Sequence, residues 1–191
     1  MPHPTPLLML IGPSASGKST LARALADQGS VTLAPTWTTR PARPDEDGDT
    51  AEHRFVSEEV FDQLSAQQAF LVEGSHPGLP YRYGLPRLDG VAGIAMVILR
   101  ASHVALLASA TRRSPVVYQV CAPARDVAAR LAERRTRQAE RRLRLEAYHA
   151  ERVAGARISH RTFLNDGPVT HLVAAVSRAL AADFESGGTD A

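Results

Sequence analysis

Gly12-Pro13-Ser14-Ala15-Ser16-Gly17-Lys18-Ser19-Thr20 is the stretch from which the fold of this chain can be predicted. It follows the apolar run 7–11 and precedes a segment with a helical pattern, 21–26. Strand, glycine-rich loop and helix, in that order, are typical of a phosphate-binding loop. Glycines at the two bends let successive N–H groups and the positive end of the helix surround an anion. We therefore predict an α/β fold with a nucleotide phosphate site at this loop.

Lys18 is the only lysine in the chain, and all other basic residues besides histidine are arginines. A compact ammonium group suits a tight phosphate cradle better than a planar guanidinium does. Lys18 is expected to reach the β- and γ-phosphates of ATP, and the Ser19 hydroxyl to hold Mg²⁺. The predicted ATP-binding residues of the loop are Gly12, Ser14, Ala15, Ser16, Gly17, Lys18, Ser19 and Thr20. The alternative is a glycine-rich turn that binds nothing.

Composition narrows the class of protein. The 191 residues are 44% apolar, with a formal net charge of +2, which suits one globular domain and does not by itself favour nucleic acid. Cys121 is the lone cysteine, so no internal disulfide forms, and we expect it in the core. No apolar run is long enough for a membrane span or a secretory signal. These features predict a cytoplasmic protein that binds neither membrane nor nucleic acid.

The pattern along the chain predicts a doubly wound parallel sheet of about five strands, within one domain spanning 1–191. Core strands are expected at 7–11, 31–34, 93–99, 116–121 and 161–164. Helices are expected at 18–28, from a Ser102 cap to 112, at 125–154 and at 168–184, and a helix capped by Ser57 at 58–67. The core is assigned to 5–34 and 91–184, an acceptor-binding insertion to 35–90, a helical lid to about 133–145 and a flexible tail to 185–191.

A pair of arginines, Arg40 and Arg43, lies in a proline-rich loop after Thr36. Guanidinium and hydroxyl groups together suit a phosphate oxyanion. The arginines could instead be solvated surface residues, but beside a predicted ATP site we favour a site for a phosphorylated acceptor.

Several motifs resemble those of the guanylate kinases over nearly the whole chain. They are GPSASGKST at 12–20, TTRPARP at 38–44, HRFVSEEVF at 53–61, AFLVEG at 69–74, YRYG at 81–84 and LND at 164–166. The resemblance implies that the first motif binds ATP with Mg²⁺ and that the insertion binds GMP, so that the protein is a kinase forming GDP and ADP.

The resemblance also implies roles for single residues. The acceptor site would consist of Thr36, Arg40, Arg43, His53, Glu73 and Tyr83. Lid arginines closing over the transferring group would be Arg134, Arg135 and Arg142, which join Lys18 and Arg40 as the expected catalytic residues. Asn165 would lie at the adenine end of the ATP site. The arginine run at 134–144 could alternatively form a nucleic-acid patch, but interspersed glutamates favour a solvated helix that is partly lid.

Some positions depart from the guanylate kinase pattern. The family's guanine-reading glutamate position holds Val72, with Glu73 one residue late, so that only a bulge would return Glu73 to the site. The next core strand ends in Leu99-Arg100 rather than in aspartates, and Leu85 replaces a serine. In these departures the chain resembles the ribose 1,5-bisphosphate phosphokinases, which make 5-phosphoribosyl diphosphate. We expect GMP as the acceptor, ribose 1,5-bisphosphate as the alternative, and a non-catalytic binding module as a further alternative. The protein would be a monomer or homodimer.

Overall fold

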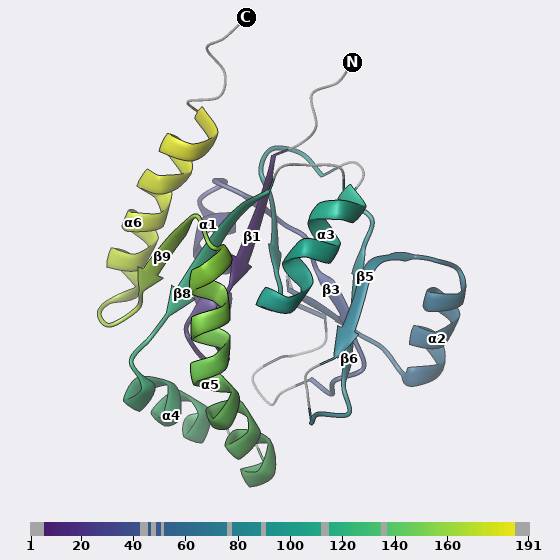
Figure 1. Cartoon of the computed structure of the whole chain (residues 1–191). Helices are drawn as coiled ribbons and strands as arrows, with labels where there is room; N and C mark the ends of the chain where they lie inside the picture. The colour runs from purple at the N-terminus through teal and green to yellow at the C-terminus, as the bar shows by residue number, and fades with distance from the viewer. Residues whose placement is uncertain are drawn as a thin grey trace, which may run out of the picture.

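The computed structural model describes residues 6–42, 46, 49–50, 52–75, 78–88, 91–111, 115–134 and 137–185, the last without its side chain. Five parallel strands form the main sheet in the order β2-β7-β1-β8-β9 (Figure 1). The strands are β1 (Leu7–Ile11), β2 (Thr32–Leu33), β7 (Ala95–Ile98), β8 (Val116–Cys121) and β9 (Arg161–Leu164). The predicted α/β class and strand count are confirmed.

Central strand β1 is fully buried, with all five side chains at 0% exposure. Leu8 and Leu10 pack on the face covered by α1 (Lys18–Asp27) and α6 (Val169–Leu180). Leu7, Met9 and Ile11 face the opposite layer, which includes α3 (Val104–Thr111). An uninterrupted apolar run is what a parallel strand with helices on both faces requires.

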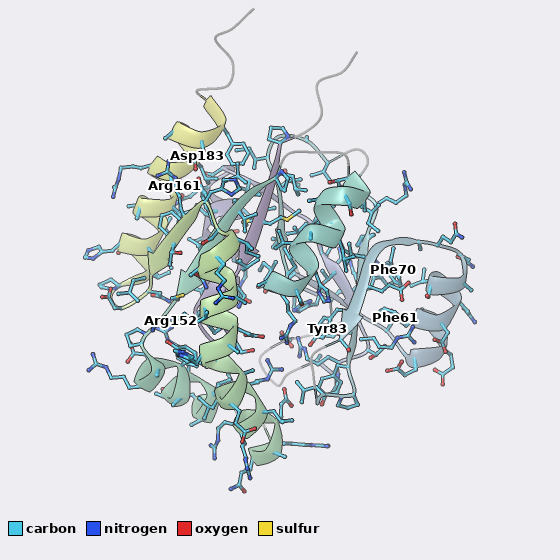
Figure 2. All side chains as sticks on the ribbon, viewed as in Figure 1. Phe61, Phe70, Tyr83, Arg152, Arg161 and Asp183 are labelled. Atoms are coloured by element: carbon cyan, nitrogen blue, oxygen red, sulfur yellow. The ribbon has the colours of Figure 1, made fainter. Side chains whose placement is uncertain are left out.

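The insertion forms a second sheet in the order β4-β3-β6-β5. Its strands are β3 (Thr36–Thr38), β4 (His53–Phe55), β5 (Phe70–Ser75) and β6 (Arg82–Pro86). Helix α2 (Glu58–Ala66) packs on this sheet and lies at the outer edge of the molecule in Figure 1. Ser57 caps it as predicted, since its side chain accepts a hydrogen bond from the Val60 amide. Figure 2 shows Phe61 of α2 beside Phe70 of β5, with ring centroids 4.8 Å apart.

Two helix predictions differ in detail from the structure. The long helical region expected at 125–154 consists of two helices, α4 (Ala124–Glu133) and α5 (Gln138–Ile158). Ser102 does not cap a helix, because it lies within a 3₁₀ turn, η1 (Ala101–His103), that leads into α3. Helical periodicity continues through both places, so it could not reveal where the backbone changes direction.

Polar side chains join the turn after α6 to the main sheet. Helix α6 continues into a π-helical turn, η2 (Ala181–Glu185). Asp183 in this turn accepts hydrogen bonds from Tyr118 Oη at 2.6 Å and from Arg161 Nε at 2.7 Å. Figure 2 shows Arg161 and Asp183 together at this end of α6. Cys121 is 5% exposed, in agreement with the expectation of a core residue.

Candidate active site

The loop after β1 has the backbone that its sequence predicts. Gly12 and Gly17 adopt φ angles of +136° and +103°. A Cβ atom on Gly12 would lie 2.1 Å from the Val120 carbonyl oxygen of β8. The loop therefore packs too closely on the sheet to accept a side chain at its first bend.

The Lys18 ammonium group is held inside the curve of this loop. Its Nζ donates to the carbonyl oxygens of Gly12 and Pro13, each at 2.8 Å. Burial lowers the pKa of Lys18 to about 8, against the opposing attraction of Glu151. The positive charge is thus poorly solvated, and an incoming phosphate would stabilise it.

Side chains from distant parts of the chain brace the loop from outside. Asn165 Nδ2 donates to the Ser16 carbonyl oxygen at 2.9 Å, and Arg130 Nη1 donates to the Ala15 carbonyl oxygen at 3.2 Å. Asn165 is 8% exposed and lies against Gly17. The structure therefore gives Asn165 a loop-supporting contact, and its expected role at adenine stays a prediction.

A cavity lies beside the phosphate loop, and only some of the predicted loop residues line it. Gly12, Ser14, Ala15, Gly17, Lys18 and Ser19 line it. Ser16 is fully buried, and its hydroxyl has no hydrogen-bond partner among the described residues. Thr20 is exposed on α1 and does not line the cavity, so the structure does not bring it to the site.

Helix α5 supplies an arginine that sequence analysis did not select. Arg144 Nη1 donates to Ser14 Oγ at 2.9 Å, and its Nη2 to Glu140 Oε1 at 2.6 Å. The predicted Arg142 lies on the far side of the helix, with its side chain 81% exposed and paired with Glu146. Side chains two positions apart on a helix, such as Arg142 and Arg144, point in directions that differ by about 200°, so only one of them can face the loop. The structure therefore places Arg144, and not the predicted Arg142, against the loop.

The other two predicted lid arginines have different outcomes. Arg134, at the end of α4, lines the cavity. Its charge lies near enough to Lys18 to contribute to lowering the pKa of that ammonium group. Arg135 lies outside the described residues.

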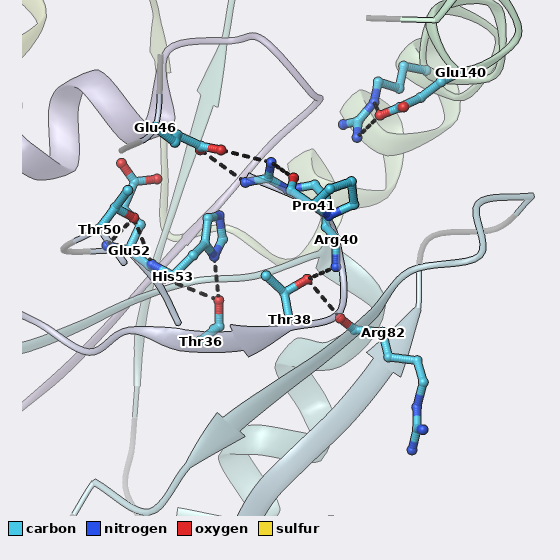
Figure 3. A network of polar contacts seen from close by, with 11 residues as sticks. Thr36, Thr38, Arg40, Pro41, Glu46, Thr50, Glu52, His53, Arg82 and Glu140 are labelled. Carbon is cyan, nitrogen blue, oxygen red and sulfur yellow. Dashed lines mark hydrogen bonds and ion pairs between the residues drawn. The ribbon is translucent and has the colours of Figure 1, made fainter. Parts of the chain in front are cut away.

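Strands β3, β4 and β6 supply polar groups to the same cavity. Thr36 Oγ1 and His53 Nδ1 are 2.9 Å apart, and the His53 ring centroid is 6.2 Å from that of Tyr83. All three residues line the cavity, and Figure 3 shows the Thr36–His53 contact. The pairing of β3 with both β4 and β6 brings these residues together.

Arg40 is 4% exposed, and it lines the same cavity. Its Nη1 and Nη2 donate to the two oxygens of Glu46, at 2.8 and 3.0 Å (Figure 3). The guanidinium also lies over the Phe55 ring, 5.1 Å from its centroid. A planar carboxylate here occupies the fork that could grip a phosphate. Arg43, the second predicted arginine, lies outside the described residues.

Glu73 points away from the cavity, contrary to its predicted role. It accepts a hydrogen bond from Ser65 Oγ of α2 at 2.8 Å and lies 3.8 Å from Arg82 Nη2. A register shift does occur in β5, between Phe70 and Val72, and Glu73 nevertheless contacts α2. Val72 and Leu85 line the cavity where a guanine-reading group was expected.

Two carboxylates and a further arginine complete the cavity wall. Glu52, which precedes β4, and Glu151 of α5 both line it. Arg100, just after β7, contacts Glu151 with its Nη2 at 2.9 Å. The described residues contain no cluster of three or more His, Cys, Asp or Glu side chains that could hold a metal ion. None of the helices in the described part of the chain has the length and apolar character to cross a membrane.

Several known proteins are similar to this chain in sequence or fold. The model of the family described as guanylate kinase matches residues 5–183. A bifunctional ribose 1,5-bisphosphokinase-thymidine phosphorylase of Azorhizobium caulinodans is 36% identical over 137 residues, which cover 69% of this chain and 19% of that protein. A guanylate kinase of Symbiobacterium thermophilum is 40% identical over 82 residues, which cover 40% of this chain and 38% of that protein. The matches thus span well under half of these two relatives.

The solved structure of guanylate kinase from Anaplasma phagocytophilum aligns with a TM-score of 0.70 at 20% identity. The alignment covers 94% of this chain and 86% of that one. At this identity the likeness supports the fold.

Proposed function

We propose that this chain, which belongs to the guanylate kinase family, transfers the γ-phosphoryl group of ATP to the phosphate of a small phosphorylated acceptor. The observation that carries the proposal is one cavity lined both by the phosphate loop and by Thr36, Arg40, His53 and Tyr83. A donor phosphate and an acceptor phosphate held there would face each other. Positioning and charge neutralisation supply most of the catalysis in such transfers.

The transfer needs no covalent enzyme intermediate. An oxygen of the acceptor phosphate attacks the γ-phosphorus, the bond from that phosphorus to the β,γ-bridging oxygen breaks, and ADP leaves. The attacking oxygen is already ionised at neutral pH, so no general base is required. Lys18 and the loop amides would hold the β- and γ-phosphates, while Arg144 and Arg134 would neutralise charge on the moving group.

The residues present fit a magnesium ion held together with ATP. Ser19 lines the cavity next to Lys18, and Glu52 and Glu151, which line the same cavity, supply negative charge. Mg²⁺ is usually held by few protein groups together with substrate phosphates and water, so a three-carboxylate cage is not needed. The ion would shield charge between the phosphates; Ser19 is the residue we expect to bind it.

Ribose 1,5-bisphosphate is the acceptor that the site supports best. Val72 and Leu85 present apolar side chains to the cavity, and Glu73 faces α2. A guanine base would find few partners for its polar edge there, and unpaired polar groups cost binding strongly. A relative at 36% identity is named for phosphorylating this sugar.

GMP remains a second candidate because relatives named guanylate kinase match at 40% identity. The arrangement of Thr36, His53 and Tyr83 would suit the phosphate of either compound. A non-catalytic binding module, the third alternative, is disfavoured by the intact loop and by the placement of Lys18 within it.

A coupled assay of ADP release with GMP, dGMP, AMP and ribose 1,5-bisphosphate tests the proposal, with Lys18→Met as the background control. We expect turnover with the sugar bisphosphate and at most background rates with the nucleotides. Turnover with GMP instead would replace the acceptor and keep the kinase activity. No turnover with any acceptor, together with no ATP binding by calorimetry, would overturn the proposed function.

A further inference from the structure

Arg100 has one side-chain donor with no hydrogen-bond partner in the described part of the chain. Leu99 continues the hydrogen bonding of β7 to β1, with its amide 3.2 Å from the Leu10 carbonyl oxygen, so Arg100 stands at the edge where the phosphate loop begins. Its Nη2 pairs with Glu151. Its Nη1 is buried and has no hydrogen-bond partner among the described residues. An unsatisfied buried N–H of a guanidinium is costly, and a small rotation toward the cavity would offer it to a ligand.

His103 lies beside Arg100 on the η1 turn, where its amide donates to the Arg100 carbonyl oxygen at 3.0 Å. Its ring covers Gly74 of β5 closely, since a Cβ atom built on Gly74 would lie 2.2 Å from Cε1 and 2.3 Å from Nε2 of that ring. Any larger residue at 74 would displace the imidazole. Burial, with a smaller contribution from Arg100, lowers the pKa of His103, so the free imidazole favours its neutral form, which can still donate one N–H to an anion.

The cavity therefore has arginine side chains at two separate places, and His103 accompanies the second. Arg40 comes from the insertion, after β3, whereas Arg100 and His103 come from the main sheet, after β7. Apolar side chains line the cavity as well, namely Val72, Leu85, Leu99 and Leu107. This distribution suits a molecule with an anionic group at each end and a compact middle.

We propose that Arg100 and His103 bind the second phosphate of the acceptor, so that the protein selects sugar bisphosphates over acceptors with one phosphate. The inference rests on the proposed function, and it assigns a second anion subsite in the same cavity. In ribose 1,5-bisphosphate, the phosphate on C1 receives the phosphoryl group near Arg40. The phosphate on C5 lies against Arg100 and His103. Glu151 keeps Arg100 Nη2 in place while Nη1 gains its missing acceptor.

The test compares ribose 1,5-bisphosphate with ribose 1-phosphate, which lacks the second phosphate. Dissociation constants are measured by calorimetry for the wild type, Arg100→Gln and Gly74→Ala, which moves His103 without touching Arg100. We expect the wild type to bind the bisphosphate about 30-fold more tightly than the monophosphate, as charge-assisted hydrogen bonds of this kind allow. Both variants should lose most of this preference and keep their affinity for ribose 1-phosphate.

Two controls separate this effect from general damage. Arg125→Gln removes a charge whose side chain is 87% exposed on α4, and it should retain the full preference. Arg40→Gln should weaken both compounds alike, because both carry the phosphate on C1. Melting curves show whether each variant is folded.

The inference is overturned if Arg100→Gln and Gly74→Ala retain the preference, or if they weaken both sugars equally. Turnover by the wild type reports on the proposed function separately. ADP release with the bisphosphate together with an unchanged preference removes only the role of Arg100 and His103. A lost preference without ADP release would retain the binding site and remove the reaction.

Discussion

Arg144 of α5 donates a 2.9 Å hydrogen bond to the Ser14 hydroxyl of the phosphate loop, although 130 positions separate the two residues. Glu140, one turn earlier on the helix, fixes the same guanidinium through its Nε and Nη2. Helix α5 is thereby attached to the loop that would hold ATP. A guanidinium in this place can exchange the serine hydroxyl for a phosphate oxygen when nucleotide binds.

Neutralising Arg144 should therefore impair the reaction. We expect Arg144→Gln to lower kcat/KM about 10- to 100-fold, because it removes charge-assisted hydrogen bonds near the transferring group. Arg142→Gln is the matched control, since this side chain is 81% exposed, and its kcat/KM should stay within about twofold of the wild type. Steady-state kinetics measure both, and a larger loss in Arg142→Gln would contradict the assignment.

ATP binding should depend on pH through Lys18. The pKa of Lys18 is lowered to about 8 in the free protein by burial, and bound phosphates raise it again because they stabilise the ammonium form. Binding above pH 8 should thus take up a proton, and the affinity for ATP should fall as pH rises further. Calorimetry in two buffers with different ionisation enthalpies measures this uptake. Lys18→Met should bind ATP weakly and show no such proton uptake.

Glu73 should be dispensable for catalysis. Because it faces Ser65 and Arg82 rather than the cavity, Glu73→Ala should leave the KM for the acceptor within about twofold. Thr36→Val removes a hydroxyl that lines the cavity and should raise this KM about tenfold. Kinetics with a varied acceptor concentration distinguish the two, and a Glu73→Ala variant as impaired as Thr36→Val would restore the glutamate to the site.

Asp183 should make stability sensitive to acid. Its hydrogen bond with Arg161, opposed by partial desolvation, lowers the pKa of this carboxyl to about 2. A carboxyl whose pKa is depressed by folding stabilises the protein above its unfolded pKa of about 3.9, and this contribution disappears as pH falls through the folded value. Asp183→Asn should therefore melt at a lower temperature than the wild type at pH 6. The difference should shrink between about pH 4 and pH 2, and a constant difference would contradict this interpretation.

Much of the core could be predicted because its signals are local. The apolar run of β1 predicts a buried parallel strand, and the glycines at 12 and 17 predict the bends of the loop. Ser57 predicts the start of α2 because its side-chain oxygen can cap the helix. The predicted strands 116–121 and 161–164 match β8 and β9 residue for residue. The phosphate loop followed from these short-range rules alone.

The site was less accessible to sequence analysis. Several arginines occur between 130 and 144, and their spacing does not tell which one turns toward the loop; the pairing of Glu140 with Arg144, four residues apart, was the available signal. For Glu73, a bulge in β5 was anticipated as a means of returning it to the cavity. The register shift in β5 actually lies between Phe70 and Val72, and its place depends on the pairing of β5 with β6.

The sequence by itself determined the fold class, the phosphate loop and the single lysine within it, because turns and buried strands depend on residues that are close along the chain. Only the tertiary structure decided that Arg144 rather than Arg142 meets Ser14, that Glu73 is turned outward and that Arg100 faces the cavity with Arg40. These outcomes depend on strand register and on the rotation of α5 about its axis. Contacts between distant segments set both quantities, and the local pattern offers only a partial signal, the Glu140–Arg144 pair.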